Sequence, residues 1–387
     1  MSNSELNSGF PSVWRSPTLS ANMIRPFATR LDALPWARLA PSLAAAEDAL
    51  ARLDERIARS PIRDGWCARN HFAEAVSSLL LDGTLVQLED LVLHDAGLDA
   101  RAPSPELTRA HAHLRRARRL ASLPPGTSLD VDGLLALVGR ASPSTTPRNE
   151  PSPLSSEAVG DNAWDMALSE VDALLARTDR LLARAAFPSP GEPTGLAGPA
   201  HPDRGERLAR WASEIEATRD WPATLAAARA LVAWQLADPL PEEGDLGRLI
   251  AADLLRARGK MRSHLTDLSS GLRAVPPERR RHRDPLVRLQ AVLDGLTLGA
   301  TRGLEDHDRR QTARETLLRR IGPRRSNSHL PQLVELVIAA PLVTTETIAD
   351  TLGVTARAAA GMVAELGLRE ITGRGRYRAW GILYHDR

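Results

Sequence analysis

The chain has 387 residues, long enough for two or three domains, and its formal net charge is only +2. Hydrophobic residues make up 43%, charged residues 25% and aromatic residues 4%, a balance that favours a mainly all-α fold over a sheet-rich one. Cys67 is the single cysteine, which excludes a disulfide framework and a multi-cysteine zinc site, and no apolar run approaches the ~20 residues needed to span a bilayer. The N-terminus also lacks a basic-then-apolar leader, so we expect a cytoplasmic protein with no membrane partner.

The first half of the chain predicts a tail and a set of helices. Residues 1–40 carry scattered Ser, Pro and Asn and predict an N-terminal tail. From Pro41 to about Ala58 the apolar residues recur every three or four positions, which indicates a helix. A second helix is predicted from Arg69 to a stop at 82–84, and a basic helix from Pro105 to Leu120. We therefore expect an N-terminal helical region over residues 41–140.

A Pro/Ser/Thr-rich stretch divides the helical pattern. Its composition predicts a linker over residues 141–160. A helical pattern resumes from Trp164 to Arg184 and, after a Pro/Gly-rich loop, continues from Arg207 to about Arg320. The second helical region is accordingly placed at residues 161–320.

The C-terminal residues 322–387 show the pattern of a winged helix-turn-helix. A first helix ends before Pro341, Thr344 or Thr345 caps a short second helix, and 353–355 supply a turn with a glycine and a fresh cap. Ala356–Leu366 is the third helix, the one expected to enter the major groove. We expect its packing residues to be Ala358, Ala359, Met362, Val363 and Leu366.

A strand, a tight turn and a second strand follow between Leu368 and Leu383, and the two glycines and three arginines at the turn are typical of a wing that touches phosphates or the minor groove. The predicted DNA-binding residues are Thr345, Thr355, Arg357, Arg374, Arg376 and Arg378. Only Arg357 could form a bidentate contact with guanine from the start of the third helix, so specificity would need the wing or a homodimer. The alternative is a module that mediates protein contacts alone.

Three segments of the chain carry the motifs of one known family: residues 74–84, Glu-Ala-Val-Ser-Ser-Leu-Leu-Leu-Asp-Gly-Thr, residues 234–248 and residues 370–374. Together they resemble the Fic family of AMP-transferring proteins that end in a winged helix. Residues 74–84 are similar to that family's inhibitory helix, with Ser78, Asp82 and Gly83 at the matching positions. Residues 234–248 are similar to its catalytic loop, and 370–374 to its wing. The layout also resembles an uncharacterised family of helix-turn-helix proteins in rhizobia.

The departures from the Fic pattern predict a body that has lost the activity. The resemblance implies a general-base histidine where this chain has Asp238, and a carboxylate with a reference pKa of ~3.9 is a weak base. Ala251 replaces the family's second arginine and Asp245 adds negative charge. We expect no catalytic residue and a degenerate loop consisting of Asp238, Glu242, Gly244, Gly247 and Arg248. Arg248 is interpreted as a partner of Glu242 or Glu243, and Asp82 as a residue that ends its helix.

Other constellations point to no further chemistry. His111 and His113 lie two apart on a predicted helix and so face different sides, which does not suit a shared metal. The run 278–284, Glu-Arg-Arg-Arg-His-Arg-Asp, is interpreted as a solvated loop that could add a phosphate contact. No metal and no cofactor are expected.

The sequence thus predicts a mainly all-α protein with a Fic-like helical body and a winged helix-turn-helix that carries a small β-hairpin. The predicted function is a DNA-binding transcriptional regulator whose partner is double-stranded DNA and whose body serves as a scaffold, a dimerisation unit or a sensor. The alternatives are a protein adenylyltransferase that transfers AMP from ATP and a nucleotide-sensing binding module.

Overall fold

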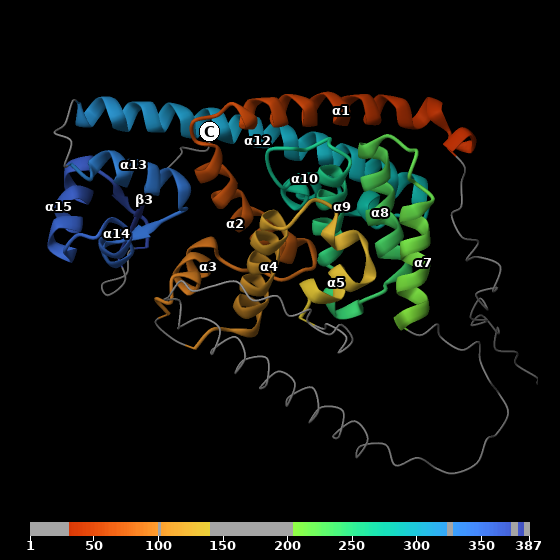
Figure 1. The fold of residues 1–387 in the computed structure, drawn as a ribbon, viewed down its shortest axis with the longest axis horizontal. Helices are drawn as coiled ribbons and strands as arrows, with labels where there is room; N and C mark the ends of the chain where they lie inside the picture. The colour runs from red at the N-terminus through yellow and green to blue at the C-terminus, as the bar shows by residue number, and fades with distance from the viewer. Residues whose placement is uncertain (1–30, 100–101, 140–203, 323–327, 373–377, 383–387) are drawn as a thin grey trace, which may run out of the picture. The chain divides into compact units, whose positions relative to one another are not determined.

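The structure is a computed structural model that describes residues 31–99, 102–139, 204–322, 328–372 and 378–382 (Figure 1). The predicted linker, the helix predicted at 164–184, and Arg374 and Arg376 lie outside these residues. The chain comprises two compact units, 1–35 and 36–387. In the first unit the described element is the 3-10 turn η2 (Leu31–Ala33).

The second unit confirms the mainly all-α fold. Two short 3-10 turns, η3 (Thr127–Leu129) and η4 (Pro241–Glu243), accompany its helices. The helices of the body are α1 (Trp36–Ala58), α2 (Arg63–Leu81), α3 (Leu88–Asp95), α4 (Pro105–Ser122), α5 (Val131–Leu137), α7 (Arg204–Glu216), α8 (Ala223–Ala237), α9 (Leu246–Ala257), α10 (Leu268–Ala274), α11 (Pro277–Arg280) and α12 (Pro285–Ile321). In the part of the chain that the structure describes, no helix is both long enough and apolar enough to cross a membrane.

Two predicted helix starts are wrong. Helix α1 begins at Trp36, so Pro41 lies inside it and the predicted tail is too long. Pro41 is in the second turn, where the missing N–H of proline removes only one intrahelical hydrogen bond. Helix α2 begins at Arg63, six residues before the predicted Arg69. Its first turn already buries Trp66, but neighbouring Asp64 and Gly65 obscure the apolar period in the sequence.

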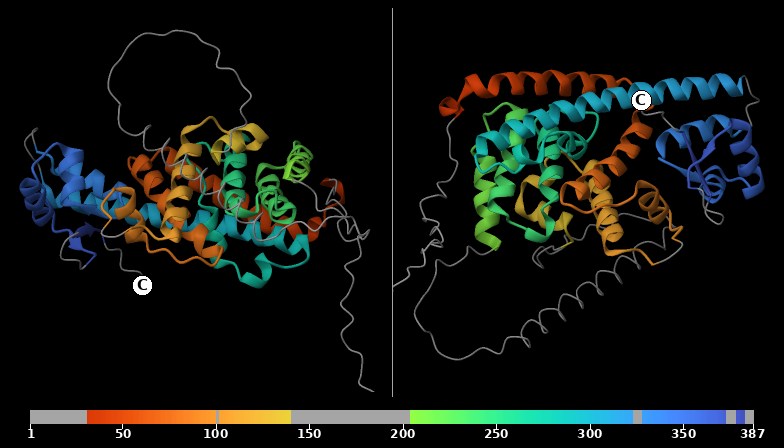
Figure 2. Two further views of the ribbon diagram at one scale, coloured as in Figure 1. Left: turned by 90° about the horizontal axis from the view of Figure 1, so that it is seen from below. Right: turned by 180° about the vertical axis from the view of Figure 1, so that it is seen from behind.

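The body is built around α12, which packs against both α1 and α10. Helices α1 and α12 run side by side, as the views of Figures 1 and 2 agree, and α10 packs on α12 through glycines. A Cβ on Gly271 would lie 2.0 Å from the carbonyl oxygen of Gly295, so this crossing depends on glycine. Helix α8 is buried on nearly all sides between α7, α9 and α12, which explains why its sequence is apolar all round.

The C-terminal module contains α13 (Leu330–Ala339), α14 (Thr345–Leu352) and α15 (Ala356–Leu366). The predicted hairpin is present as β2 (Arg369–Glu370) and β3 (Ala379–Gly381), paired with Glu370 opposite Trp380. A third strand, β1 (Val343–Thr344), pairs antiparallel with β3 and gives the order β1-β3-β2. Strand β1 was not predicted from the sequence, because a two-residue strand shows no alternation of apolar and polar residues.

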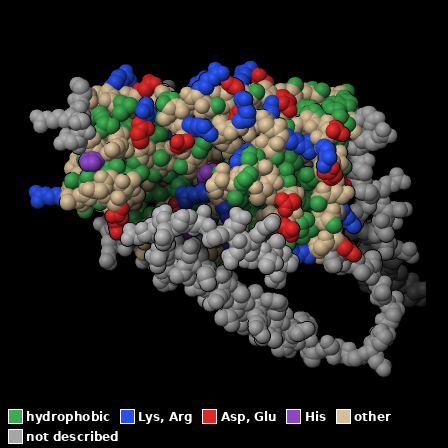
Figure 3. Space-filling model, viewed as in Figure 1, with side chains coloured by type: hydrophobic (Ala, Val, Ile, Leu, Met, Phe, Trp, Pro, Cys, Tyr) green, Lys and Arg blue, Asp and Glu red, His purple; other side chains and the backbone are tan. Residues whose placement is uncertain are grey.

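The core of this module extends into the body. Ile62, just before α2, and Leu317 and Ile321 at the end of α12 pack in the same apolar cluster as Leu333 and Val363 of the module. The module is therefore packed on the body, and its helices continue the core of the body. Over the face shown in Figure 3, basic and acidic side chains are interspersed, in keeping with a net charge of only +2.

Candidate functional site

The α14–turn–α15 unit has the geometry of a helix-turn-helix. Gly353 ends α14 in the left-handed region (φ 66°), and the Thr355 hydroxyl accepts a hydrogen bond from Ala358 N (3.2 Å), which caps α15. Of the two capping candidates for α14, the structure selects Thr344, whose Oγ1 accepts from Thr347 N at 3.0 Å. Thr345 is instead the first residue of α14 and is half-buried.

Helix α15 presents a face of short side chains and one arginine. Ala359, Val363 and Leu366 are buried as predicted, but Ala358 is exposed, so the prediction that it packs in the core is wrong. With Thr355 as cap, positions 359, 363 and 366 share the inner face and 358 turns to the solvent. Arg357 is exposed at the start of the helix. Short neighbours would allow the helix backbone to approach a groove closely around this guanidinium.

The described part of the hairpin holds its arginine against its own strands. Arg378 Nε donates to Glu370 Oε2 at 2.7 Å, and the guanidinium lies 5.5 Å from the centre of the Trp380 ring. The side chain remains 57% exposed, so a phosphate could reach it on its outer side. Arg374 and Arg376, which the sequence predicts at the tip, lie outside the described residues.

Contacts that no sequence pattern indicated hold the module on the body. Arg69 of α2 donates Nη1 to the carbonyl oxygens of Val337 (3.3 Å) and Ala340 (2.8 Å) and Nη2 to that of Pro341 (3.4 Å), at the end of α13. A Cβ on Gly65 would lie 3.2 Å from Ala339 Cα, so α2 and α13 cross closely there. The end of α15 is likewise held by α12, where Arg320 Nη1 donates to Leu366 O at 2.9 Å.

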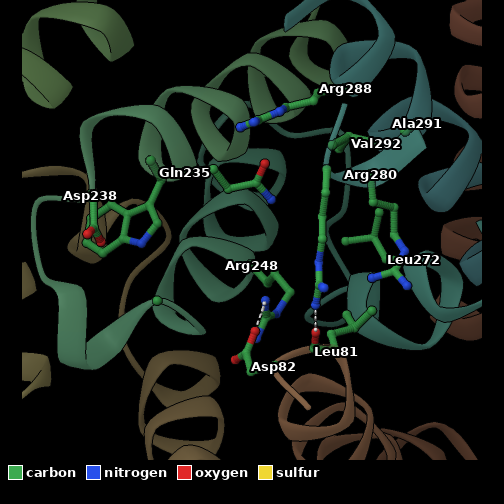
Figure 4. A pocket seen from close by; sticks show the side chains of 13 residues that line it. Leu81, Asp82, Gln235, Asp238, Arg248, Leu272, Arg280, Arg288, Ala291 and Val292 are labelled. Carbon is green, nitrogen blue, oxygen red and sulfur yellow. Dashed lines mark hydrogen bonds and ion pairs between the residues drawn. The ribbon is translucent and has the colours of Figure 1, made fainter. Parts of the chain in front are cut away.

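A second candidate site is a cavity of about 300 Å³ lined by four arginines, Arg248, Arg280, Arg281 and Arg288 (Figure 4). We call it the arginine cavity. Gln235 and Asp238 of the α8 end and Asp82 of the α2 end also line it. Arg280 and Arg281 of the run 278–284 thus line the wall of this cavity. The sequence had predicted a solvated loop for this run. Four guanidinium groups around one cavity favour an anionic ligand.

Arg248 brings together the residues that resemble an inhibitory helix. Its Nη2 donates to Ser78 Oγ (2.7 Å) and to Asp82 Oδ2 (2.8 Å), and its Nη1 to Asp82 Oδ1 (3.2 Å) (Figure 4). The interpretation that Arg248 pairs with Glu242 or Glu243 is therefore wrong. Glu243 instead accepts two hydrogen bonds from Arg116, at 2.6 and 2.8 Å. Asp82 also ends α2 as expected, and Gly83 follows it with φ 85°.

The two glycines and Asp238 of the loop occupy different structural positions. A Cβ on Gly247 would lie 2.4 Å from Trp234 Cδ1, so glycine is required there by packing and not by an approaching phosphate. Gly244 has open space around it and lines the arginine cavity. Asp238 ends α8 with φ 42°, and among the described residues it is the one non-glycine residue with positive φ.

Asp245 does not face the arginine cavity as a repelling charge but is held in a buried network. Its Oδ2 lies 2.5 Å from His113 Nδ1, and Glu74 Oε1 lies 3.7 Å from His113 Nε2. Burial alone would lower the pKa of His113, but the hydrogen bond with Asp245 and the nearby Glu74 carboxylate raise it above its ordinary value. Burial and the charge of Glu74 raise the pKa of Asp267 well above its ordinary value.

This network joins α2, α4 and the starts of α9 and α10. Because His113 is 0% exposed, its imidazole cannot reach a substrate, and we assign it to the packing of the four elements. His111, by contrast, contacts Asp95, so the prediction that the two histidines face different sides is confirmed. Among the described residues, no three His, Cys, Asp or Glu side chains are arranged to hold a metal ion.

Comparison with known proteins supports the module and the layout. A family model for a helix-turn-helix DNA-binding domain matches residues 330–383, and a model for a protein family of unknown function, DUF1612, matches residues 200–322. The chain is also 41% identical over 355 residues to the uncharacterised protein y4cF of Sinorhizobium fredii, a match that covers 86% of this chain and 93% of the relative. The prediction of a DNA-binding helix-turn-helix and the resemblance to a rhizobial protein are thereby confirmed.

Proposed function

We propose that this chain, which belongs to the same family as the uncharacterised protein y4cF of Sinorhizobium fredii, is a DNA-binding transcriptional regulator. The observation that carries the proposal is the capped α14–turn–α15 unit, with Arg357 exposed at the start of α15, in the residues that match a DNA-binding domain. Such a unit places its second helix in the major groove.

The cap residues, helix α15 and the hairpin would each contact a different part of the DNA. Arg357 would read a guanine edge, and the Thr355 and Thr345 side chains would contact phosphates at the helix starts. The hairpin would act as a wing, with Arg374, Arg376 and Arg378 against the backbone or in the minor groove. One arginine on α15 gives little sequence discrimination, so we infer that the protein binds as a homodimer on two half-sites about 34–36 Å apart.

The test is DNA binding by the full chain, because the module at 322–387 shares its core with the body. Fluorescence anisotropy with a labelled duplex should show an affinity that falls steeply between 50 and 200 mM salt, as release of counterions requires. Arg374→Ala with Arg376→Ala should weaken binding to all duplexes and reduce the salt slope, and Arg357→Ala should reduce discrimination between sequences.

The matched control is Arg219→Ala. Arg219 is an exposed arginine between α7 and α8, with 74% of its side chain accessible. Its replacement should leave the affinity for DNA unchanged. Binding that does not depend on salt, or that is lost equally in the control, would exclude the proposal in favour of a module for protein contacts.

A second candidate function concerns the body, which we propose is a Fic-like scaffold, centred on residues 161–320, that senses a nucleotide. The supporting observation is the arginine cavity. AMP transfer is the weaker form of this candidate, because Asp238 ends α8 where the resemblance implies a general base. We expect ATP to bind without covalent transfer, and Arg288→Gln to weaken binding. Radiolabel retained on the denatured protein after incubation with labelled ATP would establish the transferase instead.

A further inference from the structure

A larger cavity lies between α2 and α12, the two helices that also hold the C-terminal module. It has a volume of about 570 Å³, within the range of small-molecule sites. Trp66 and Asn70 of α2 line one side, Thr266 and Arg273 lie at α10, and Arg302 and Arg309 come from α12. We call it the junction cavity. None of its four arginines lines the arginine cavity, so the two are separate sites.

The charge around the junction cavity is positive. Four arginines line it, against Glu305 and Asp306, and Asp306 is paired with Arg310. Asp267 also lines it, and burial and the neighbouring Glu74 carboxylate raise its pKa, which disfavours a further negative charge there. Arg302 donates one N–H to Ser270 O (2.8 Å), and Arg309 has no hydrogen bond or ion pair with a described residue. Guanidinium groups therefore remain to receive an anion.

Two buried polar atoms in the wall also lack a partner. The indole Nε1 of Trp66 and the hydroxyl of Thr266 make no hydrogen bond with any described residue, although their side chains are only 1% and 2% exposed. Buried polar groups are almost always paired, and an unpaired one is costly. Because both residues line the junction cavity, a ligand oxygen that accepts from the indole N–H would supply the missing partner.

We propose that the junction cavity binds a small organic acid with at least two carboxylates, and that its occupancy changes DNA binding. Two carboxylates match the unpaired positive charge, one at the outer arginines of α12 and one directed toward Trp66. The ring of Trp66 and the side chain of Leu53 provide an apolar wall for the carbon skeleton. The effect on DNA binding rests on the proposed function, whereas the binding site itself does not.

The path from the cavity to the module is short. Trp66 is the neighbour of Gly65, which touches Ala339 of α13, and it lies one helical turn before Arg69, which binds the end of α13. On the other side, α12 continues from Arg309 to Leu317 and Ile321 in the core of the module. A ligand that draws α2 and α12 together at the cavity would therefore alter the way both helices hold the DNA-binding unit.

The binding test is isothermal titration calorimetry on the full chain, with citrate and isophthalate as probes and benzyl alcohol as the uncharged control. We expect saturable binding of at least one carboxylate with a Kd below about 1 mM, and the better probe shows whether the ligand carries a ring. Arg302→Gln with Arg309→Gln, two exposed residues, should weaken binding at least tenfold. Arg219→Gln is the control and should have no effect, because Arg219 is an exposed arginine that lines neither cavity. No saturable binding of either probe, or equal losses in both variants, would overturn the proposed site.

The regulatory part is tested by DNA anisotropy at constant ionic strength with and without the better probe. We expect a change in affinity of threefold or more that disappears in the Arg302→Gln, Arg309→Gln variant. If the probe binds and DNA affinity is unchanged, the regulatory link is refuted while the site stands. If the protein binds no DNA but still binds the probe, the proposed function and the link both fall, and again the site stands.

Discussion

Replacing Arg69 by Met should loosen the DNA-binding module without unfolding the body. Arg69 makes one short hydrogen bond of 2.8 Å and two long ones of 3.3 and 3.4 Å to carbonyls at the end of α13. A hydrogen bond from a charged donor is worth ~1.5–3 kcal/mol, and a cation at a helix C-terminus adds a few tenths to 1 kcal/mol. Since Arg69 is half-buried and two of its bonds are long, we expect a loss of ~2–3 kcal/mol at this contact.

The assay is hydrogen exchange of the α13 amides, measured by mass spectrometry on the full chain. A loss of ~2–3 kcal/mol corresponds to a ~30- to 150-fold fall in protection over residues 330–340, with α8 unchanged. Arg63→Met is the control, because Arg63 on the same helix donates to Ser263 O of the body (3.2 Å) and not to the module. Equal changes in α13 for both variants, or no change for Arg69→Met, would refute the idea that Arg69 holds the module.

Three further variants test the body. Arg248→Met should lower the free energy of unfolding by ~3 kcal/mol, the lower end of the range for a broken buried ion pair, because the Asp82 side chain is 32% exposed. A double-mutant cycle with Asp82→Ala, measured by urea unfolding, should show a coupling energy above ~1 kcal/mol, and additive losses would contradict the pairing. Gly247→Ala should cost up to ~3 kcal/mol, because its Cβ would lie 2.4 Å from Trp234, and wild-type stability in urea would disprove the clash. Because the pKa of His113 is raised in the folded state, the stability that this residue contributes is complete below its unfolded pKa of ~6.5 and is lost as the pH rises through the folded pKa. His113→Gln should therefore flatten the decline of unfolding free energy with pH. An unchanged pH profile would contradict this role of His113.

The C-terminal module was predictable because local chemistry specifies it. The cap residues, the glycine turn and the small residues of α15 all lie within about 25 residues, and each acts on its own neighbours. Even there the sequence could not choose between Thr344 and Thr345 as the cap, since both precede the same helix. The choice depends on β1, where Thr344 pairs opposite Ala379, a residue 35 positions later.

The contacts of the body were not predictable in the same way. The sequence places Arg248 next to acidic residues at 242 and 243, so a local pair was the natural expectation. The structure instead joins Arg248 to Ser78 and Asp82, 170 and 166 positions away. The inhibitory-helix resemblance identified both ends of this contact but not their pairing. For His113 and Arg69 no pattern existed, because a single residue whose partner is distant in sequence leaves no local period.

Helix α2 contacts the DNA-binding module and also lines both cavities of the body, which explains how the body and the module can act as one unit. The first half of α2 holds α13 through Gly65 and Arg69 and lines the junction cavity through Trp66 and Asn70. Asp82, which follows its last residue, lines the arginine cavity. A helix transmits displacement along its axis because its backbone hydrogen bonds resist local change. The ligands that we propose for the two cavities would therefore act on the same rigid element that fixes α13. The orientation of α15 toward DNA is then a property of the whole unit from Trp36 onward, and not of the module alone.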